Sequence, residues 1–90
     1  MIPERSSLFA PAFQKSFAKK PPKMQAAIAE CIKKVCTDPT NPGLRLKRVQ
    51  GCAGVFEARV DRANRVTLHF DGPTVVFRNH CNHDVISRNP

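Results

Sequence analysis

Arginines, histidines and one carboxylate alternate with apolar residues between Val55 and Cys81, in the run VFEARVDRANRVTLHFDGPTVVFRNHC. Such groups are suited to holding and cleaving a phosphodiester, because guanidinium groups bind its oxygens and carboxylate or imidazole groups transfer protons. Successive side chains of a β-strand point to opposite faces, so the alternation predicts that the polar groups share one face of a small sheet. The predicted polar face carries Glu57, Arg59, Arg65, His69, Arg78 and, at its end, His80.

Three strand-like runs must position these groups, and they are separated by short turns at Arg62-Ala63-Asn64 and Asp71-Gly72-Pro73. Short turns between strands favour an antiparallel meander. The intervening residues of the runs are apolar, and we expect them to be buried against the rest of the protein: Phe56, Ala58, Val60, Val66, Leu68, Phe70, Val75 and Phe77.

Two helices are predicted before these strands. Phe9, Phe13 and Phe17 recur at every fourth position and give an apolar stripe on a short helix that ends before Pro21-Pro22. The second helix has the strongest pattern, with apolar residues at i, i+3, i+4, i+7, i+8 and i+11, and it ends at Thr37-Asp38-Pro39. Its apolar positions are Met24, Ala27, Ile28, Cys31, Ile32 and Val35.

A further strand is predicted at Leu44–Val49, where Leu44 and Leu46 point inward and Lys47 points outward, while Arg48 breaks the alternation. A short edge strand is expected around Ser6–Phe9. The order of helices followed by strands predicts a single α+β domain over residues 1–90, with two N-terminal helices packed on an antiparallel sheet of about four strands.

The charge of the chain indicates a polyanionic partner. Fifteen Lys and Arg residues against seven Asp and Glu residues give a formal net charge of +8, which suits nucleic acid, an anionic membrane or an acidic protein. A basic surface without a partner is the structural alternative. No apolar run approaches the ~20 residues of a membrane span, and the N-terminus lacks the apolar segment of a signal peptide, so we expect a cytoplasmic protein without a membrane partner.

The four cysteines are therefore expected to be thiols, because disulfides are uncommon in a reducing compartment. Cys31 and Cys36 diverge on the predicted helix, and the sequence has no CxxC or HxxxH pair that would indicate zinc. We expect neither a metal site nor a small-molecule cofactor.

The segments GLRLKRVQG, VFEARV, NRVTLHF and NHDVISRNP, in this order of elements, resemble the RelE/ParE superfamily of bacterial toxins from about Phe9 to Pro90. The resemblance implies a helical hairpin on a curved antiparallel sheet whose open face holds the active site. It also implies a cognate antitoxin with an extended segment that wraps the toxin. Family members that act on RNA cleave mRNA in the ribosomal A site without metal, whereas others inhibit DNA gyrase.

Site residues carry over from the family position by position. Arg65 matches the arginine that contacts the scissile phosphate, and His83 matches a C-terminal position that holds a catalytic polar group. Glu57 and Arg59 lie on a strand that often carries catalytic groups. RNA contacts are expected from Lys47, Arg48, Arg78 and His69. One departure is that this chain has no Tyr, which many RNA-cleaving members carry near the C-terminus, where Ile86 stands here.

Metal-free RNA cleavage uses the 2′-hydroxyl of the substrate as nucleophile and needs a base, an acid and cations on the non-bridging oxygens. Arg65 is expected to bind these oxygens beside Arg59 or Arg78, because arginine stays protonated and cannot act as the base. The base and the acid would come from Glu57, His69 and His83.

Each of these groups also has a purely structural interpretation. A cross-strand ion pair would explain Glu57, Arg59 and Arg65 without catalysis. His69 is then a solvated side chain, and His83 with Asp84 forms a turn or helix cap.

The sequence thus predicts the toxin of a type II toxin–antitoxin system, an endoribonuclease that cleaves ribosome-bound mRNA. The alternative is a non-enzymatic binder, either a ParE-like gyrase inhibitor or an inactive toxin-fold protein that binds nucleic acid.

Overall fold

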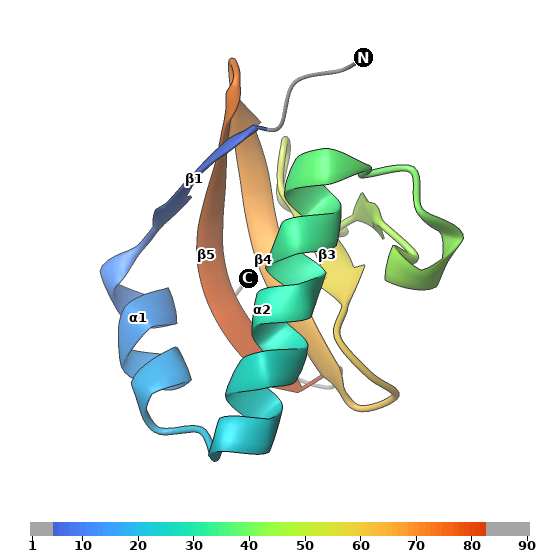
Figure 1. Ribbon diagram of the computed structural model, residues 1–90. Helices are drawn as coiled ribbons and strands as arrows, with labels where there is room; N and C mark the ends of the chain where they lie inside the picture. The colour runs from blue at the N-terminus through green and yellow to red at the C-terminus, as the bar shows by residue number, and fades with distance from the viewer. Residues whose placement is uncertain (1–4, 83–90) are drawn as a thin grey trace.

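Two α-helices lie against one face of a five-stranded sheet in the computed structural model, which describes residues 5–82 (Figure 1). The strand order in the sheet is β1-β5-β4-β3-β2. The predicted α+β class, with two N-terminal helices before the main strands, is confirmed. In chain order the elements are β1 (Ser6–Phe9), α1 (Pro11–Ala18), α2 (Pro22–Thr37), a 3-10 turn (Pro42–Leu44), β2 (Lys47–Arg48), β3 (Phe56–Arg59), β4 (Asn64–Asp71) and β5 (Thr74–Asn82).

Both helices begin with proline. Pro11 and Pro22 occupy first-turn positions, where the missing backbone N–H costs no helical hydrogen bond. The apolar stripe of α2 buries Ile28, Cys31 and Val35 beneath the helix. Burial of this stripe against the sheet, more than intrinsic helix propensity, stabilises a helix of this length.

Aromatic rings join α1 to the sheet. Phe9 lies at the end of β1 rather than on the helix, but its ring stacks on Phe13 with the centroids 5.4 Å apart. Phe13 in turn stacks on Phe17, at 6.3 Å, and lies 5.9 Å from the ring of Phe77 on β5. Of the predicted stripe, Phe13 is buried and Phe17 packs against the core, whereas Phe9 lies on a strand and is 36% exposed.

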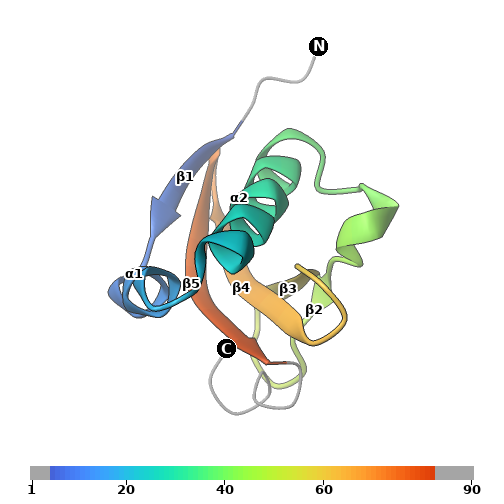
Figure 2. The same cartoon turned by 60° about the horizontal axis from the view of Figure 1, so that its bottom comes forward.

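The edge strand β1 makes the sheet mixed instead of wholly antiparallel. It lies beside β5 (Figure 2) and runs parallel to it, with Ser6 opposite Thr74 and Phe9 opposite Phe77, whereas the other neighbouring strands are antiparallel. A parallel neighbour needs a long crossover connection, and here the two helices separate β1 from the later strands along the chain. The predicted edge strand at Ser6–Phe9 is thus confirmed. Its parallel direction was not predicted from the sequence.

The strand predicted at Leu44–Val49 is shorter than expected. Leu44 belongs to a 3-10 turn that begins where the Asn41 side chain accepts a hydrogen bond from the Gly43 N–H at 2.9 Å. Arg45 then adopts a left-handed conformation, with φ 46°, so pairing with β3 is restricted to Lys47 and Arg48. Leu44 is nevertheless buried, as the alternation predicted.

A β-bulge lies in β5 beside β4. Thr67 pairs with Asn79 and the next residue, Leu68, pairs with Phe77, so Arg78 is the additional residue of the bulge. The bulge reverses the side-chain alternation along the C-terminal half of β5, because one extra residue exchanges the two faces of the strand.

Candidate nucleic-acid interface

The side of the sheet away from the helices, here termed the open face, carries the predicted polar groups. Ala58 is fully buried in the helix-side core, so Glu57 and Arg59 on either side of it point the opposite way. Their cross-strand partners Thr67 and Arg65 share that face. In Figure 1 the helices lie in front of the sheet, so the open face is directed away from the viewer. The polar residues of the open face within the described chain include Lys47, Glu57, Arg59, Arg65, Thr67, His69, Arg78 and Asn79.

Arg59 and Arg65 occupy directly opposite positions on β3 and β4. Both side chains are half-buried. Like charges at opposite positions of an antiparallel pair destabilise the sheet, and within the described chain neither arginine pairs with a carboxylate. Two arginines at opposite positions on one face would suit an anion that contacts both guanidinium groups.

Local hydrogen bonds hold the guanidinium of Arg65 beside the β3–β4 turn. Its Nη1 donates to the backbone carbonyls of Asp61 at 2.5 Å, Asn64 at 3.0 Å and Arg62 at 3.3 Å. Within the described residues the Arg65 side chain makes no other hydrogen bond, so only Nη1 of its three guanidinium nitrogens is used. The other nitrogens therefore remain available to an anion.

The turn itself is organised by Asp61. Its carboxylate accepts hydrogen bonds from the Asn64 side-chain amide and from the backbone N–H groups of Ala63 and Asn64, at 2.9–3.0 Å. The amide of Asn64, these backbone donors and the charge of Arg65 lower the pKa of Asp61 below its usual value. The turn thus presents Arg65 from a rigid support, a role of Asp61 and Asn64 that the sequence interpretation missed. The signal was the Asp-x-x-Asn spacing between two strands.

Arg59 is anchored from the helix side through its backbone. The Cys31 thiol on α2 donates to the Arg59 carbonyl at 3.5 Å. Burial raises the pKa of Cys31 to about 12, so the group stays a neutral donor. Cys31 and Cys36 are buried, whereas Cys52 is partly exposed.

Glu57 lies on the open face but is not displayed as predicted. It is 4% exposed and forms an ion pair with Lys47 on β2, with Nζ and Oε1 3.4 Å apart. Glu57 therefore forms a cross-strand ion pair, but with Lys47 and not with Arg59 or Arg65 as predicted. The Lys47 side chain remains 62% exposed and can reach a further anion.

His69 and Arg78 form a second polar pair on the open face. Arg78 Nη1 and His69 Nδ1 are 3.1 Å apart. Since a guanidinium only donates, Nδ1 must accept this hydrogen bond, and the Nε2 of the neutral ring carries the proton. His69 is held in a tautomer that can donate to a phosphate or base, while its acceptor nitrogen is already in use.

His80 is not on the open face, and this expectation was wrong. The bulge at Arg78 places His80 opposite Val66, on the helix side, where it is 5% exposed. Neither ring nitrogen has a hydrogen-bond partner among residues 5–82. Burial, together with the charge of Lys20, lowers the pKa of His80, with Asp61 acting weakly in the opposite direction.

The remaining predicted site residues are not gathered on the described open face. Arg48 pairs with Phe56, whose ring packs against the core, so Arg48 lies on the helix side. His83, predicted as a catalytic group, lies outside the described residues, as does Ile86.

Residues 5–82 contain neither a candidate metal centre nor a membrane-spanning helix. No group of three or more His, Cys, Asp and Glu side chains in this part of the chain could hold a metal ion. No helix there is long and apolar enough to cross a membrane.

This chain is similar to known proteins in its structure, whereas comparisons of its sequence find no match. No family model matches the sequence, and no curated protein matches it. A chain of the toxin–antitoxin complex RelBE2 from Mycobacterium tuberculosis is similar, with a TM-score of 0.74 and 23% identity over 89% of this chain and 99% of that chain.

Two other solved structures extend this similarity. The YoeB/ParE toxin from Agrobacterium tumefaciens has a TM-score of 0.75 and 13% identity, over 87% of this chain and 98% of that chain. A chain of the DinJ-YafQ toxin–antitoxin complex from E. coli has a TM-score of 0.66 and 14% identity, over 91% and 96%. The chain therefore has the fold of the RelE/ParE toxins, in agreement with the resemblance found in its sequence.

Proposed function

We propose that this chain is the toxin of a type II toxin–antitoxin system and that it cleaves ribosome-bound mRNA without a metal ion. The observation that carries the proposal is the pair of opposite arginines, Arg59 and Arg65, on the open face of a RelE/ParE-like sheet. Such a pair is costly for folding and suits a bound phosphate. The complexes of similar structures support an antitoxin as partner.

In the proposed reaction the 2′-oxygen of the RNA attacks the adjacent phosphorus. A base removes the 2′-hydroxyl proton, the bond from phosphorus to the 5′-oxygen breaks, and an acid protonates the departing oxygen. The products are a 2′,3′-cyclic phosphate and a 5′-hydroxyl. Arg65 and Arg59 bind the non-bridging oxygens, where charge accumulates in the transition state.

The other predicted site residues would act around this centre. Lys47, Arg78 and His69 would bind the RNA backbone or a base, whereas Arg48, on the helix side, is not proposed to act there. Glu57 and His83 are the proposed acid–base groups. Glu57 would have to leave its ion pair with Lys47 to accept a proton, so binding of the phosphate to Lys47 must accompany that step.

The test is cleavage of ribosome-bound mRNA by the purified chain, with ends mapped by primer extension. Arg59→Gln is the sharpest variant, because Arg59 makes no side-chain hydrogen bond within the described residues. We expect cleavage to fall by a factor of roughly 10²–10³, as for loss of one donor to a developing oxyanion. Expression should arrest growth, and the substitution should relieve the arrest.

Arg62→Gln is the matched control, since Arg62 is an exposed arginine of the same turn and its side chain faces no strand partner. It should cleave as the unchanged chain does. Intact mRNA in the presence of the unchanged chain, or equal loss in both variants, would contradict the proposal.

The second candidate is binding without cleavage, for example inhibition of DNA gyrase. It is favoured by the state of the described acid–base groups, because Glu57 is buried in an ion pair and the acceptor nitrogen of His69 is occupied. A gyrase supercoiling assay separates the two candidates: inhibition of supercoiling with no RNA product would establish the second.

A further inference from the structure

Glu57 and Lys47 form an ion pair whose two members differ in their freedom to move. Glu57 is 4% exposed and lies on β3, which has β4 on one side and β2 on the other. Lys47 lies directly opposite it on β2, with Nζ 3.4 Å from Oε1. Within the described chain Lys47 is the one cation that pairs with this carboxylate. The buried charge of Glu57 therefore depends on a single lysine.

Lys47 can leave this pair at little cost. It belongs to a strand of two residues at the edge of the sheet, and its side chain is 62% exposed. A lysine ammonium on a flexible stem pairs only weakly with a carboxylate where water surrounds it. A phosphate close to Lys47 would therefore compete with Glu57 for the ammonium group.

A bound RNA strand would bring such a phosphate within reach. Lys47 is a diagonal cross-strand neighbour of Arg59, because it lies opposite Glu57, two residues before Arg59 on β3. Diagonal neighbours on one face of a sheet are about 7–8 Å apart. With the cleaved phosphate at Arg59 and Arg65, a flanking phosphate of the same strand comes close enough to contact the Lys47 ammonium.

We propose that a phosphate flanking the cleaved one draws Lys47 away from Glu57 and thereby makes this carboxylate the base of the reaction. The inference rests on the proposed cleavage of RNA. A carboxylate paired with an ammonium is a poor proton acceptor, whereas a buried carboxylate without a counter-charge takes up a proton readily. Lys47 thus acts through Glu57, as a positioning residue.

One proton moves in this step. It passes from the 2′-hydroxyl to a carboxylate oxygen of Glu57, while Lys47 keeps its own proton and contacts the flanking phosphate. When the product leaves, Glu57 returns the proton to water and pairs with Lys47 again. The substrate is therefore a strand with at least two neighbouring charged phosphates, because a dinucleotide with one phosphate would leave Glu57 in its ion pair.

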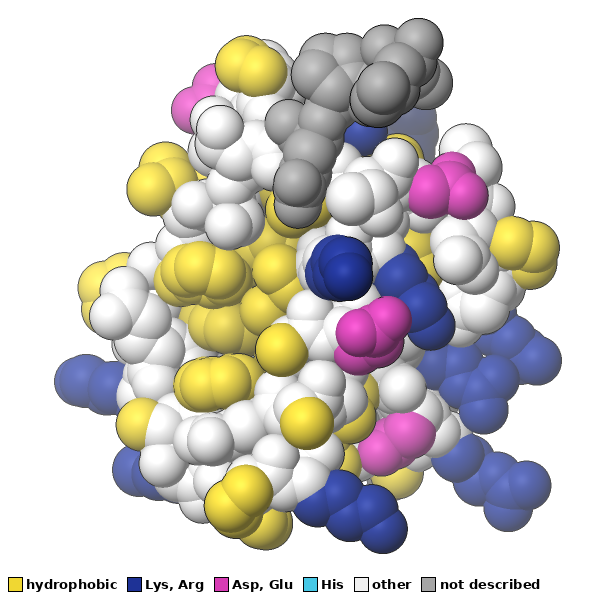
Figure 3. Space-filling model, viewed as in Figure 1, with side chains coloured by type: hydrophobic (Ala, Val, Ile, Leu, Met, Phe, Trp, Pro, Cys, Tyr) yellow, Lys and Arg dark blue, Asp and Glu magenta, His cyan; other side chains and the backbone are white. Residues whose placement is uncertain are grey.

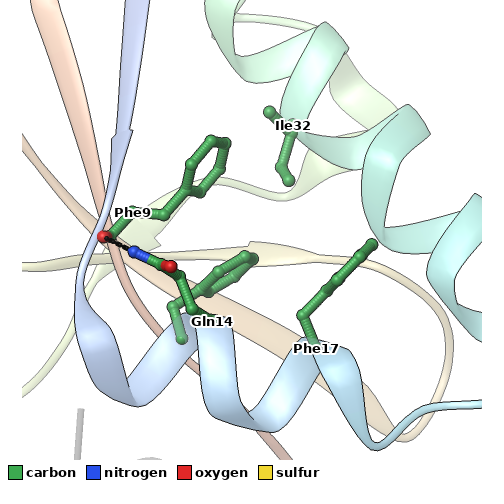
Figure 4. A pocket seen from close by; sticks show the side chains of 5 residues that line it. Phe9, Gln14, Phe17 and Ile32 are labelled. Atoms are coloured by element: carbon green, nitrogen blue, oxygen red, sulfur yellow. Dashed lines mark hydrogen bonds between the residues drawn. The ribbon is translucent and has the colours of Figure 1, made fainter.

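The helix side of the sheet supplies a control lysine far from Glu57. In Figure 3 dark blue basic side chains lie outside an apolar hollow between α1 and α2. Figure 4 shows Phe9, Phe17 and Ile32 directed toward this hollow, and no titratable side chain lines it. Lys33 is an exposed lysine of α2 beside Ile32 in the sequence. Lys33→Met removes the same charge as Lys47→Met without altering the ion pair.

The first test uses ribosome-bound mRNA in which one phosphate flanking the cleaved bond is replaced by an uncharged methylphosphonate. Single-turnover rates at saturating protein separate the chemical step from binding. At one of the two flanking positions the replacement should slow the unchanged chain by roughly tenfold or more, a part of the ~10²–10⁴ that a positioned base contributes. Lys33→Met should respond in the same way.

Lys47→Met should instead cleave both messages at the rate of the unchanged chain on natural mRNA, because Glu57 is already free of its counter-charge. Slow cleavage of both messages by Lys47→Met would show that Lys47 is only a phosphate contact, and would overturn the proposal. Glu57→Gln and the double variant Glu57→Gln/Lys47→Met should be equally slow, since the base is absent from both.

The second test does not need cleavage. The side-chain carboxyl of Glu57, labelled with ¹³C and assigned with Glu57→Gln, is followed by NMR during addition of an RNA oligonucleotide with 2′-deoxyribose at the cleaved position. Its resonance should shift as the flanking phosphate takes Lys47. The same oligonucleotide with the methylphosphonate should leave the resonance in place. In Lys47→Met the resonance should be shifted before RNA is added and should not respond.

Equal rates on charged and neutral messages at both flanking positions would overturn the proposal, as would a Glu57 resonance that stays in place when the charged oligonucleotide is bound. Both measurements use the unchanged chain, so they decide the matter even if Lys47→Met does not fold. Absence of cleavage together with a shifted Glu57 resonance would contradict the proposed function, while the displacement of Lys47 by a phosphate would stand.

Discussion

Arg59 and Arg65 have equivalent positions in the register but different local environments. Arg65 donates three hydrogen bonds to the carbonyls of the β3–β4 turn, whereas Arg59 makes none with its side chain in the described chain. The repulsion between the two charges acts on both. A substitution of Arg59 should therefore impair function without lowering stability, whereas a substitution of Arg65 should impair both.

We predict that Arg59→Gln raises the free energy of unfolding by roughly 0.2–1 kcal/mol at low salt, because it removes a like-charge pair. Arg65→Gln should instead lower it by about 1–2 kcal/mol, since hydrogen bonds of a charged donor to the turn are lost. Urea unfolding at 20 mM and 500 mM salt measures both values. The gain at Arg59 should shrink at high salt, and a destabilised Arg59→Gln would show that the two charges do not repel.

At the scale of the elements, the bulge in β5 decides which side chains reach each face. Without it, His80 would lie on the open face beside the arginines. With it, His80 is buried opposite Val66, and its ring nitrogens have no hydrogen-bond partner in the described part of the chain. A buried imidazole of this kind resists protonation, which links the bulge to the pH dependence of stability.

The lowered pKa of His80 predicts that acid destabilises the fold. The unfolded chain binds this proton near the ordinary histidine pKa of about 6.5, whereas the folded chain binds it only at lower pH. As far as His80 is concerned, the free energy of unfolding is therefore greatest above about pH 6.5. It decreases as the pH falls from there through the pKa of His80 in the folded chain. His80→Leu, which needs no hydrogen-bond partner, should flatten the change in melting temperature between pH 7.5 and 5.

The matched variant is His69→Gln, on the open face, which should keep the steep part of the profile. Parallel pH profiles for His80→Leu and the unchanged chain would exclude His80 as the source of the acid sensitivity.

At the scale of the whole molecule, the charge of +8 is divided between two faces with different chemistry. The open face carries arginines and His69, whose planar groups bind a phosphate in a defined orientation. The helix side carries the lysines of α1 and α2. Both should attract polyanions at long range, but the open face should provide the close contacts to phosphates.

We predict that binding of single-stranded RNA weakens with salt, with a slope of the logarithm of affinity near −0.7 for each phosphate contacted. The double variant Arg59→Gln/Arg65→Gln should make the slope shallower by about one or more. Lys15→Gln/Lys33→Gln has the same change of charge on the helix side and should lower affinity slightly without altering the slope. Equal changes in both double variants would mean that RNA is held only by the overall charge.

Much of this architecture follows from local pattern. The prolines at the starts of α1 and α2, the apolar stripe of α2 and the alternation in β3 and β4 each correspond to a period that the backbone imposes. The opposition of Arg59 and Arg65 could also be anticipated, because a short turn between alternating strands sets the register. These features depend on residues close together in the chain.

The tertiary structure decided what depends on distant partners. Glu57 pairs with Lys47 because β2 lies beside β3, and β1 lies parallel to β5 because two helices intervene. The bulge at Arg78 buries His80, which no periodicity indicated. The alternating run between Val55 and Cys81 thus determined a face of phosphate-binding groups, while long-range pairing decided which of those groups stand there free to bind.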